Sequence, residues 1–170
     1  MSAPGMVRAA AKSRDDWQTP AHVFHALDRE FHFELDGAAT ELNSKCPLYL
    51  SNDPLDNGPA NGGDAFKYEI GWWKSIWVNP PYGNLMLWVE LFKRWADAGA
   101  TVVALLPANT DTKWFESVWL FADEIRFVKG RIQFVGTTSS NPGGSMVVVY
   151  RGHSPVTDSP RVSLVEMPKP

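Results

Sequence analysis

Apolar residues recur at the spacing of an α-helix in three stretches of the chain. The spacing predicts helices over Thr19–Phe31, Leu85–Ala98 and Thr112–Phe121. In the clearest of them, one apolar stripe consists of Leu85, Trp88, Val89, Phe92, Trp95 and Ala96. The ends agree with this pattern. Thr19 is a suitable N-terminal cap, Pro20 suits the first helical position, and Gly99 stands where a C-terminal cap belongs.

Short apolar runs between these helices predict strands. The run from 101 to 106 has no polar alternation, which is typical of a strand buried on both faces. The strands are expected over Phe33–Asp36, Ser75–Val78, Thr101–Leu106, Glu124–Val128, Arg131–Val135 and Ser145–Tyr150. Asp53–Asp64 is expected to be a loop, because it is rich in Pro, Gly and Asn. The alternation indicates an α/β fold with a mostly parallel sheet, an antiparallel edge and helices on both faces.

The chain of 170 residues has the size of one domain, and 44% of it is hydrophobic, which is enough to form a core. Residues 1–14 are expected to be a flexible basic arm, 15–151 the folded domain and 152–170 a Pro-rich loose tail. The net charge of -3 excludes a general polycation that coats nucleic acid, but it leaves room for a local basic face.

One cysteine, Cys46, excludes a disulfide framework and a multi-cysteine zinc site, and no metal is expected. No apolar run approaches the ~20 residues of a membrane span. A reducing, cytoplasmic location is therefore the expectation.

The tetrapeptide Asn79-Pro80-Pro81-Tyr82 lies between a predicted strand and a predicted helix. In an open α/β sheet, ligands bind beyond the carboxyl ends of the strands, so this segment is expected at the mouth of a site. The prolines remove two backbone donors, which leaves the Asn79 side-chain oxygen and the Pro80 carbonyl as acceptors. Two acceptors can hold both hydrogens of a planar, conjugated amino group while Tyr82 stacks on it. This grip frees the nitrogen lone pair and aims it at an electrophile. A plain Pro-Pro turn is the alternative.

Several motifs, taken in order, resemble the phage-type DNA N6-adenine methyltransferases that use S-adenosylmethionine. They are Asp15-Asp16-Trp17-Gln18-Thr19-Pro20, Leu35-Asp36-Gly37-Ala38-Ala39, Asn43-Ser44-Lys45-Cys46, the Asn-Pro-Pro-Tyr tetrapeptide, Leu106-Pro107-Ala108-Asn109-Thr110-Asp111-Thr112 and Gly130-Arg131-Ile132-Gln133-Phe134. The resemblance covers Asp15 to Tyr150. It implies a Rossmann-like class I methyltransferase fold and makes 15–151 the methyltransferase domain. It also implies direct in-line methyl transfer to N6 of an adenine flipped out of DNA.

The resemblance also assigns residues to roles. Catalysis falls to Asn79, Pro80, Pro81 and Tyr82. Cofactor binding falls to Trp17, Thr19, Pro20, Asp36, Gly37, Ala38, Ala39, Asp64 and Asn79. Gly37-Ala38-Ala39 departs from the usual Gly-x-Gly, although small residues still permit close approach to a cofactor. Asp53 and Asp56 stay open as alternatives to Asp64, because Asn57–Gly63 resembles an enlarged loop.

Lys113, Lys129, Arg131 and Arg151 are candidates for a phosphate-binding face, and Arg131 is preferred because it lies in a family motif. DNA is the expected partner, with no membrane and no obligatory protein partner. Two other enzymes share the tetrapeptide, the N4-cytosine and the protein-glutamine methyltransferases. A silent DNA- or cofactor-binding anti-restriction protein is the alternative from another class. The family suggests evasion of restriction by a phage or prophage genome, while the recognition sequence and the oligomeric state stay open.

Overall fold

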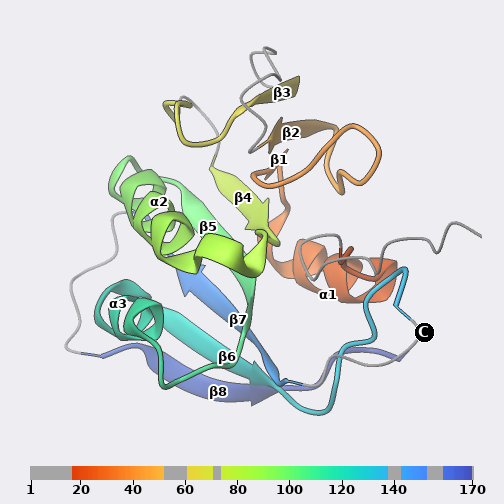
Figure 1. Ribbon diagram of the computed structural model, residues 1–170, viewed down its shortest axis with the longest axis vertical. Coiled ribbons are helices and arrows are strands. Elements are labelled where there is room, and N and C mark those ends of the chain that lie inside the picture. Colours follow the sequence, from red (N-terminus) through yellow and green to blue (C-terminus); the bar gives the residue numbers. More distant parts are fainter. Residues whose placement is uncertain (1–16, 52–60, 71–73, 138–142, 153–158, 170) are drawn as a thin grey trace, which may run out of the picture.

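A computed structural model describes residues 17–51, 61–70, 74–137, 143–152 and 159–169, so the arm expected over 1–14 lies outside the described residues. These residues form an eight-stranded sheet with helices against it (Figure 1). The helices are α1 (Ala21–Phe31), α2 (Leu85–Asp97) and α3 (Lys113–Phe121), and a 3-10 turn, η2 (Tyr82–Asn84), leads into α2. The strands are β1 (Leu35–Asp36), β2 (Leu48–Ser51), β3 (Asn61–Asp64), β4 (Ser75–Val78), β5 (Thr101–Pro107), β6 (Glu124–Val128), β7 (Ser145–Tyr150) and β8 (Arg161–Val165).

The strand order across the sheet is β3-β2-β1-β4-β5-β7-β6-β8. Strand β7 runs antiparallel to both of its neighbours, and every other pairing is parallel. The predicted α/β fold with a mostly parallel sheet is therefore confirmed. As a consequence, the carboxyl ends of β1 to β6 all lie at one edge of the sheet, which is where ligands bind in such folds.

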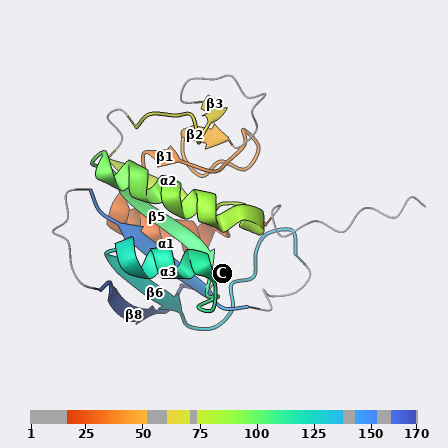
Figure 2. The same ribbon diagram turned by 60° about the vertical axis from the view of Figure 1, so that its left-hand side comes forward.

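The sheet is covered on both faces. Helices α2 and α3 lie on one face and α1 on the other (Figure 2). Alternate residues of β5 enter the two cores: Val102, Ala104 and Leu106 pack under α2 and α3, and Val103 and Leu105 pack toward α1. This two-sided burial explains the unbroken apolar run in the sequence. No helix in the described ranges is long and apolar enough to cross a membrane.

The predicted helix ends are mostly correct. Gly99 follows α2 with a φ of 104°, a backbone conformation that favours glycine. The Thr112 hydroxyl accepts a hydrogen bond from the Phe115 N–H and so caps α3. The prediction that Thr19 caps α1 is wrong, because the cap residue is Pro20, one position later, and no side chain caps the helix.

Three predictions for the rest of the chain are wrong in part. Asn61–Asp64, expected to lie in a loop, forms β3, because its backbone can pair with β2 without apolar side chains. Arg131–Val135 leaves the sheet after Gly130, whose φ of 84° turns the chain, and contributes only the isolated bridge between Gln18 and Val135. The tail expected over 152–170 contains β8, which pairs with β6 along five residues.

A buried glutamate fixes the opposite edge of the sheet. Glu124, 4% exposed, accepts two hydrogen bonds from Arg126, at 2.9 and 2.7 Å, and also pairs with Arg151 and Arg161. Arg126 in turn makes two bonds of 2.7 Å to Glu30 of α1. Burial opposes ionisation, but the bonds from Arg151 and Arg126 outweigh it and hold the pKa of Glu124 below its ordinary value. The network joins α1, β6 and β8.

A substitution at Gly152 tests the close contact between the residues after β7 and the turn after α2. A Cβ on Gly152 would lie 2.2 Å from the Gly99 carbonyl carbon and oxygen, and backbone atoms cannot swing away. We expect Gly152→Ala to lower the free energy of unfolding by more than about 2 kcal/mol in urea titrations. In the control Gly144→Ala, the nearest atom would be 3.4 Å away, so its stability should be unchanged or slightly raised. Equal stability of both variants would contradict the contact.

Candidate functional site

The pairing of β1 with β4 brings two polar side chains to one edge of the sheet. Asp36, the last residue of β1, is the register partner of Trp77 in β4. The Gly37 N–H donates to the Trp77 carbonyl at 2.8 Å, which extends the pairing by one residue. Asn79 follows β4 directly, about 7 Å further along the strand direction than the partner of Asp36.

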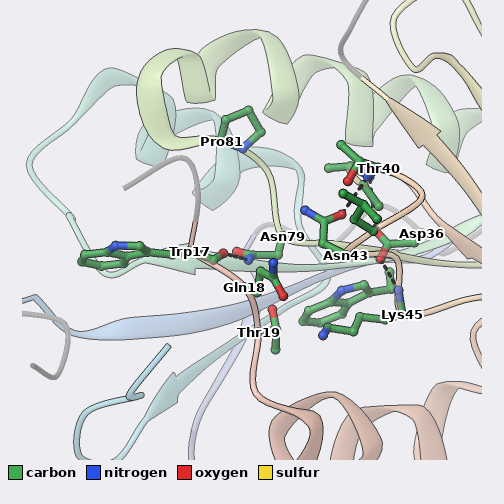
Figure 3. A pocket seen from close by; sticks show the side chains of 13 residues that line it. Trp17, Gln18, Thr19, Asp36, Thr40, Asn43, Lys45, Asn79 and Pro81 are labelled. Carbon is green, nitrogen blue, oxygen red and sulfur yellow. Dashed lines mark hydrogen bonds between the residues drawn. The ribbon is translucent and has the colours of Figure 1, made fainter. Parts of the chain in front are cut away.

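A cavity of about 560 Å³ opens beside these two residues (Figure 3). This volume is in the range of pockets that hold a small molecule or cofactor. The residues that line it come from the segment before α1, the ends of β1 and β4, and the loop after β1: Trp17, Gln18, Thr19, Asp36, Ala38, Ala39, Thr40, Leu42, Asn43, Lys45, Trp77, Asn79 and Pro81.

The carboxylate of Asp36 is 3% exposed and is held by backbone donors. Its two oxygens accept from the Lys45 N–H at 2.9 Å and from the Ala38 N–H at 3.3 Å. Burial raises the pKa of Asp36 to about 6, and these two bonds only partly oppose the rise. An ionised Asp36 is therefore a buried anion that a cationic group in the cavity would stabilise.

The side-chain amide of Asn79 has a fixed orientation. Its Nδ2 donates to the Trp17 carbonyl at 3.0 Å. Within the described part of the chain, its buried Oδ1 has no hydrogen-bond partner. Buried polar atoms without a partner are uncommon, so this oxygen is an acceptor available to a donor from a ligand.

The small residues after β1 have two different functions in the packing. Ala38 and Ala39 line the cavity. Gly37 does not, because it is buried against α2: a Cβ there would lie 2.9 Å from the Trp95 ring and 3.2 Å from Val78. The turn can pass between sheet and helix only with a glycine at this position.

Of the predicted site residues, Trp17, Thr19, Asp36, Ala38, Ala39, Asn79 and Pro81 line this cavity, whereas Pro20, Gly37, Asp64, Pro80 and Tyr82 do not. Tyr82 is half-buried in η2 and packs against the core under α2. Asp64 is the last residue of β3. Its carboxylate accepts a hydrogen bond from the Phe66 N–H at 3.0 Å and forms an ion pair with Lys67 at 3.1 Å. The alternatives Asp53 and Asp56 lie outside the described residues.

The structure adds lining residues that the sequence did not assign: Gln18, Thr40, Leu42, Asn43, Lys45 and Trp77. Gln18, Asn43 and Lys45 lie in motifs that already carried the family resemblance, so position in a motif was the available signal. Trp77 lies in no such motif. That its side chain borders the cavity depends on the register of the sheet, which the sequence does not show.

A second cavity, of about 790 Å³, lies beyond the ends of β6 and β8. Its lining includes Lys129, Arg131 and Lys169 as well as Pro20, which was predicted for the cofactor site. Lys113, at the start of α3, follows β5. Of the candidates for the phosphate-binding face, Lys113, Lys129 and Arg131 are exposed and follow carboxyl ends at the same edge of the sheet as Asn79. Arg151 does not join them, because it follows the antiparallel strand β7 and pairs with Glu124 at the opposite edge.

Comparison with known proteins agrees with this geometry. The family described as DNA N-6-adenine-methyltransferase (Dam) matches residues 7–169. The chain belongs to the Dam family. The DNA N-6-adenine-methyltransferase of Haemophilus phage HP1 is 31% identical over 165 residues, which cover 91% of this chain and 90% of the relative. That of Escherichia phage T1 is 26% identical over 162 residues, which cover 81% of this chain and 63% of the relative.

This Dam-family chain has the class I methyltransferase fold. A solved structure from Listeria monocytogenes, named as a class I S-adenosylmethionine-dependent methyltransferase, superposes with a TM-score of 0.60 at 11% identity, covering 93% of this chain and 68% of that one. The predicted class I fold is confirmed, as is the predicted family. The family description names adenine N6 in DNA, not cytosine N4 or glutamine.

The buried state of Asp36 predicts a pH dependence of stability. Because its folded pKa of about 6 lies above the ordinary 3.8, the native state binds this proton more tightly than the unfolded chain. The free energy of unfolding should therefore fall as the pH rises from about 4 to about 6, by about 3 kcal/mol for this group. The Asn side chain of Asp36→Asn does not ionise. In urea titrations, the stability of this variant should therefore rise relative to that of the wild type over the same pH interval. Parallel curves for the two proteins would contradict the buried carboxyl.

Proposed function

We propose that this chain transfers a methyl group from S-adenosylmethionine to N6 of adenine in DNA. The observation that carries the proposal is the Asn79 Oδ1, a buried acceptor without a partner in the described chain, beside a cavity that also holds a buried carboxylate. Family membership supports the choice of adenine.

In this proposal, Asn79 and Pro80 hold the target amino group. An amino group presents two hydrogens, and the Asn79 Oδ1 and the Pro80 carbonyl are two acceptors on consecutive residues. Because neither Pro80 nor Pro81 has an N–H, the segment presents no backbone donor there to repel the amino hydrogens. Holding both hydrogens favours a pyramidal nitrogen, which exposes the lone pair for attack.

The cavity residues fit the cofactor. The ionised Asp36 is suited to an ammonium group, and the alanines after it leave room for the ligand close to the backbone. Bound S-adenosylmethionine supplies a methyl group that is already activated by its sulfonium. Asp36 has only to orient the cofactor, and Asn79 has only to orient the acceptor nitrogen, so most of the rate gain comes from positioning.

DNA binding needs a surface beside the cavity, because the adenine must leave the helical stack. We assign phosphate contacts to Lys113, Lys129 and Arg131, since they lie at the same edge as Asn79. We also assign to Tyr82 the stacking on the flipped base, although its ring packs under α2 and does not line the cavity. The phage relatives suggest that the modification protects a mobile genome from restriction in the bacterial cytoplasm.

Asn79→Ala tests the role of the amide. We expect kcat for methylation of unmethylated DNA to fall about 10²- to 10³-fold, because one oriented hydrogen bond to the reacting group is lost. The assay uses labelled S-adenosylmethionine, digestion of the DNA and mass spectrometry of the nucleosides. The control Asn84→Ala removes the same group from an exposed cap position that makes no capping bond, and it should keep activity.

The labelled product decides between the candidate functions. N6-methyladenine supports the proposal. Label in cytosine or in protein would assign a different acceptor. Methylation that is equal in wild type and Asn79→Ala would remove the amide from the mechanism.

A triple variant tests whether Lys113, Lys129 and Arg131 contact the DNA phosphates. Changing Lys113, Lys129 and Arg131 to Ala should weaken DNA binding and lower the slope of log affinity against log salt by up to about 3, because each phosphate contact contributes about 0.9. The control changes Arg29, Lys74 and Lys93 to Ala. Arg29 lies in the last turn of α1, Lys93 in the carboxyl-terminal half of α2 and Lys74 just before β4. All three lie toward the opposite edge, and the same charge is removed. Equal salt slopes for the two variants would contradict this face.

A further inference from the structure

We infer that Phe134 and Val135, which lie outside the methyl-donor cavity, are positioning residues for the Asn79 amide and act through the backbone of Trp17. The inference rests on the proposed role of Asn79. It gives a function to Arg131–Val135, the segment that leaves the sheet after β6.

The contacts form a continuous path. The Asn79 Nδ2 donates to the Trp17 carbonyl at 3.0 Å. The next residue, Gln18, accepts a hydrogen bond at its carbonyl from the Val135 N–H at 2.9 Å. The Trp17 ring stacks on the Phe134 ring with centroids 5.3 Å apart and an interplanar angle of 28°. Phe134 therefore fixes the side chain of Trp17, and its neighbour Val135 fixes the backbone at Gln18.

The Trp17 carbonyl determines which end of the amide faces the substrate. If the amide were reversed, its oxygen would face the carbonyl oxygen, and its NH2 would face the hydrogens of the target amino group. Both contacts would be repulsive. With the observed orientation, the bond to Nδ2 also polarises the amide and increases the negative charge on Oδ1, because hydrogen bonds in a chain strengthen one another.

Phe134 is anchored well enough to serve as this support. It is 2% exposed and packs in the core that faces α1. The Thr137 hydroxyl donates to the Phe134 carbonyl at 2.7 Å, and the turn at Gly136, with a φ of 85°, ends the segment. Val135, by contrast, exposes half of its side chain, so the contribution of this residue is its backbone N–H.

Phe134→Leu tests the ring. We expect kcat to fall at least 10-fold, while the Kd for S-adenosylmethionine, measured by calorimetry, stays within 3-fold. Phe134→Tyr should restore kcat, since the stacking ring is kept and Phe134 also borders the second cavity. The control Phe92→Leu makes the same change in the opposite core, against Trp88 and Tyr150, away from Trp17. A loss of kcat no greater than that of Phe92→Leu would overturn the inference.

Val135→Pro tests the backbone bond without removing any core side chain. Proline lacks the N–H that Gln18 accepts, so kcat should fall, and the Asn79 side-chain NH2 resonances should shift in ¹H–¹⁵N spectra. Val135→Ala keeps the N–H and should behave as wild type. Unchanged kcat and unchanged resonances in Val135→Pro would refute the path, even if Phe134→Leu failed to fold. Absence of adenine methylation in the wild type would instead refute the proposed function.

Discussion

The in-register pairing of β1 with β4 is the constraint on which the candidate site depends. The two strands are adjacent and parallel, although 38 residues separate the last residue of one from the first of the other. Because Asp36 pairs with Trp77, the chain leaves both strands at the same edge of the sheet, and Asn79 lies only two residues beyond the partner of Asp36. A carboxylate from one loop and an amide from the other therefore border one cavity. A shift of one residue would reverse the side on which each side chain lies.

This register is secured by burial on both faces of the sheet. Trp77 is 1% exposed and contacts Phe24 and Phe33 on the side of α1, while Ile76 and Val78 pack under α2. Sliding β4 by one residue would exchange the two sets between cores of different shape and draw a polar flanking residue into the sheet, at a cost of several kcal/mol. The tight turn at Gly37 under Trp95 adds a steric limit.

Much of this arrangement could be predicted from the sequence. The helices were recognisable because their apolar stripes are long, and β4 and β5 because their apolar runs are continuous. β2, β3 and β8 were missed for physical reasons. β2 is only four residues long, and two of its residues are only partly buried. β3 and β8 are held by backbone pairing, and β8 exposes most of its side chains. The motifs indicated Asp36 and Asn79, but not the orientation of the amide. That orientation depends on Trp17, which lies 62 residues away along the chain.

Asp36 is buried within the cavity and forms no salt bridge among the described residues, so the ligand-free protein is less stable at neutral pH than it would be with an uncharged residue there. A bound cation reverses this penalty. A ligand at 100 times its Kd raises the free energy of unfolding by about 2.7 kcal/mol. Under the proposed function, the supply of methyl donor in the host controls how many molecules persist against proteolysis, as well as how fast each one works. Starvation for methionine would then deplete the enzyme itself.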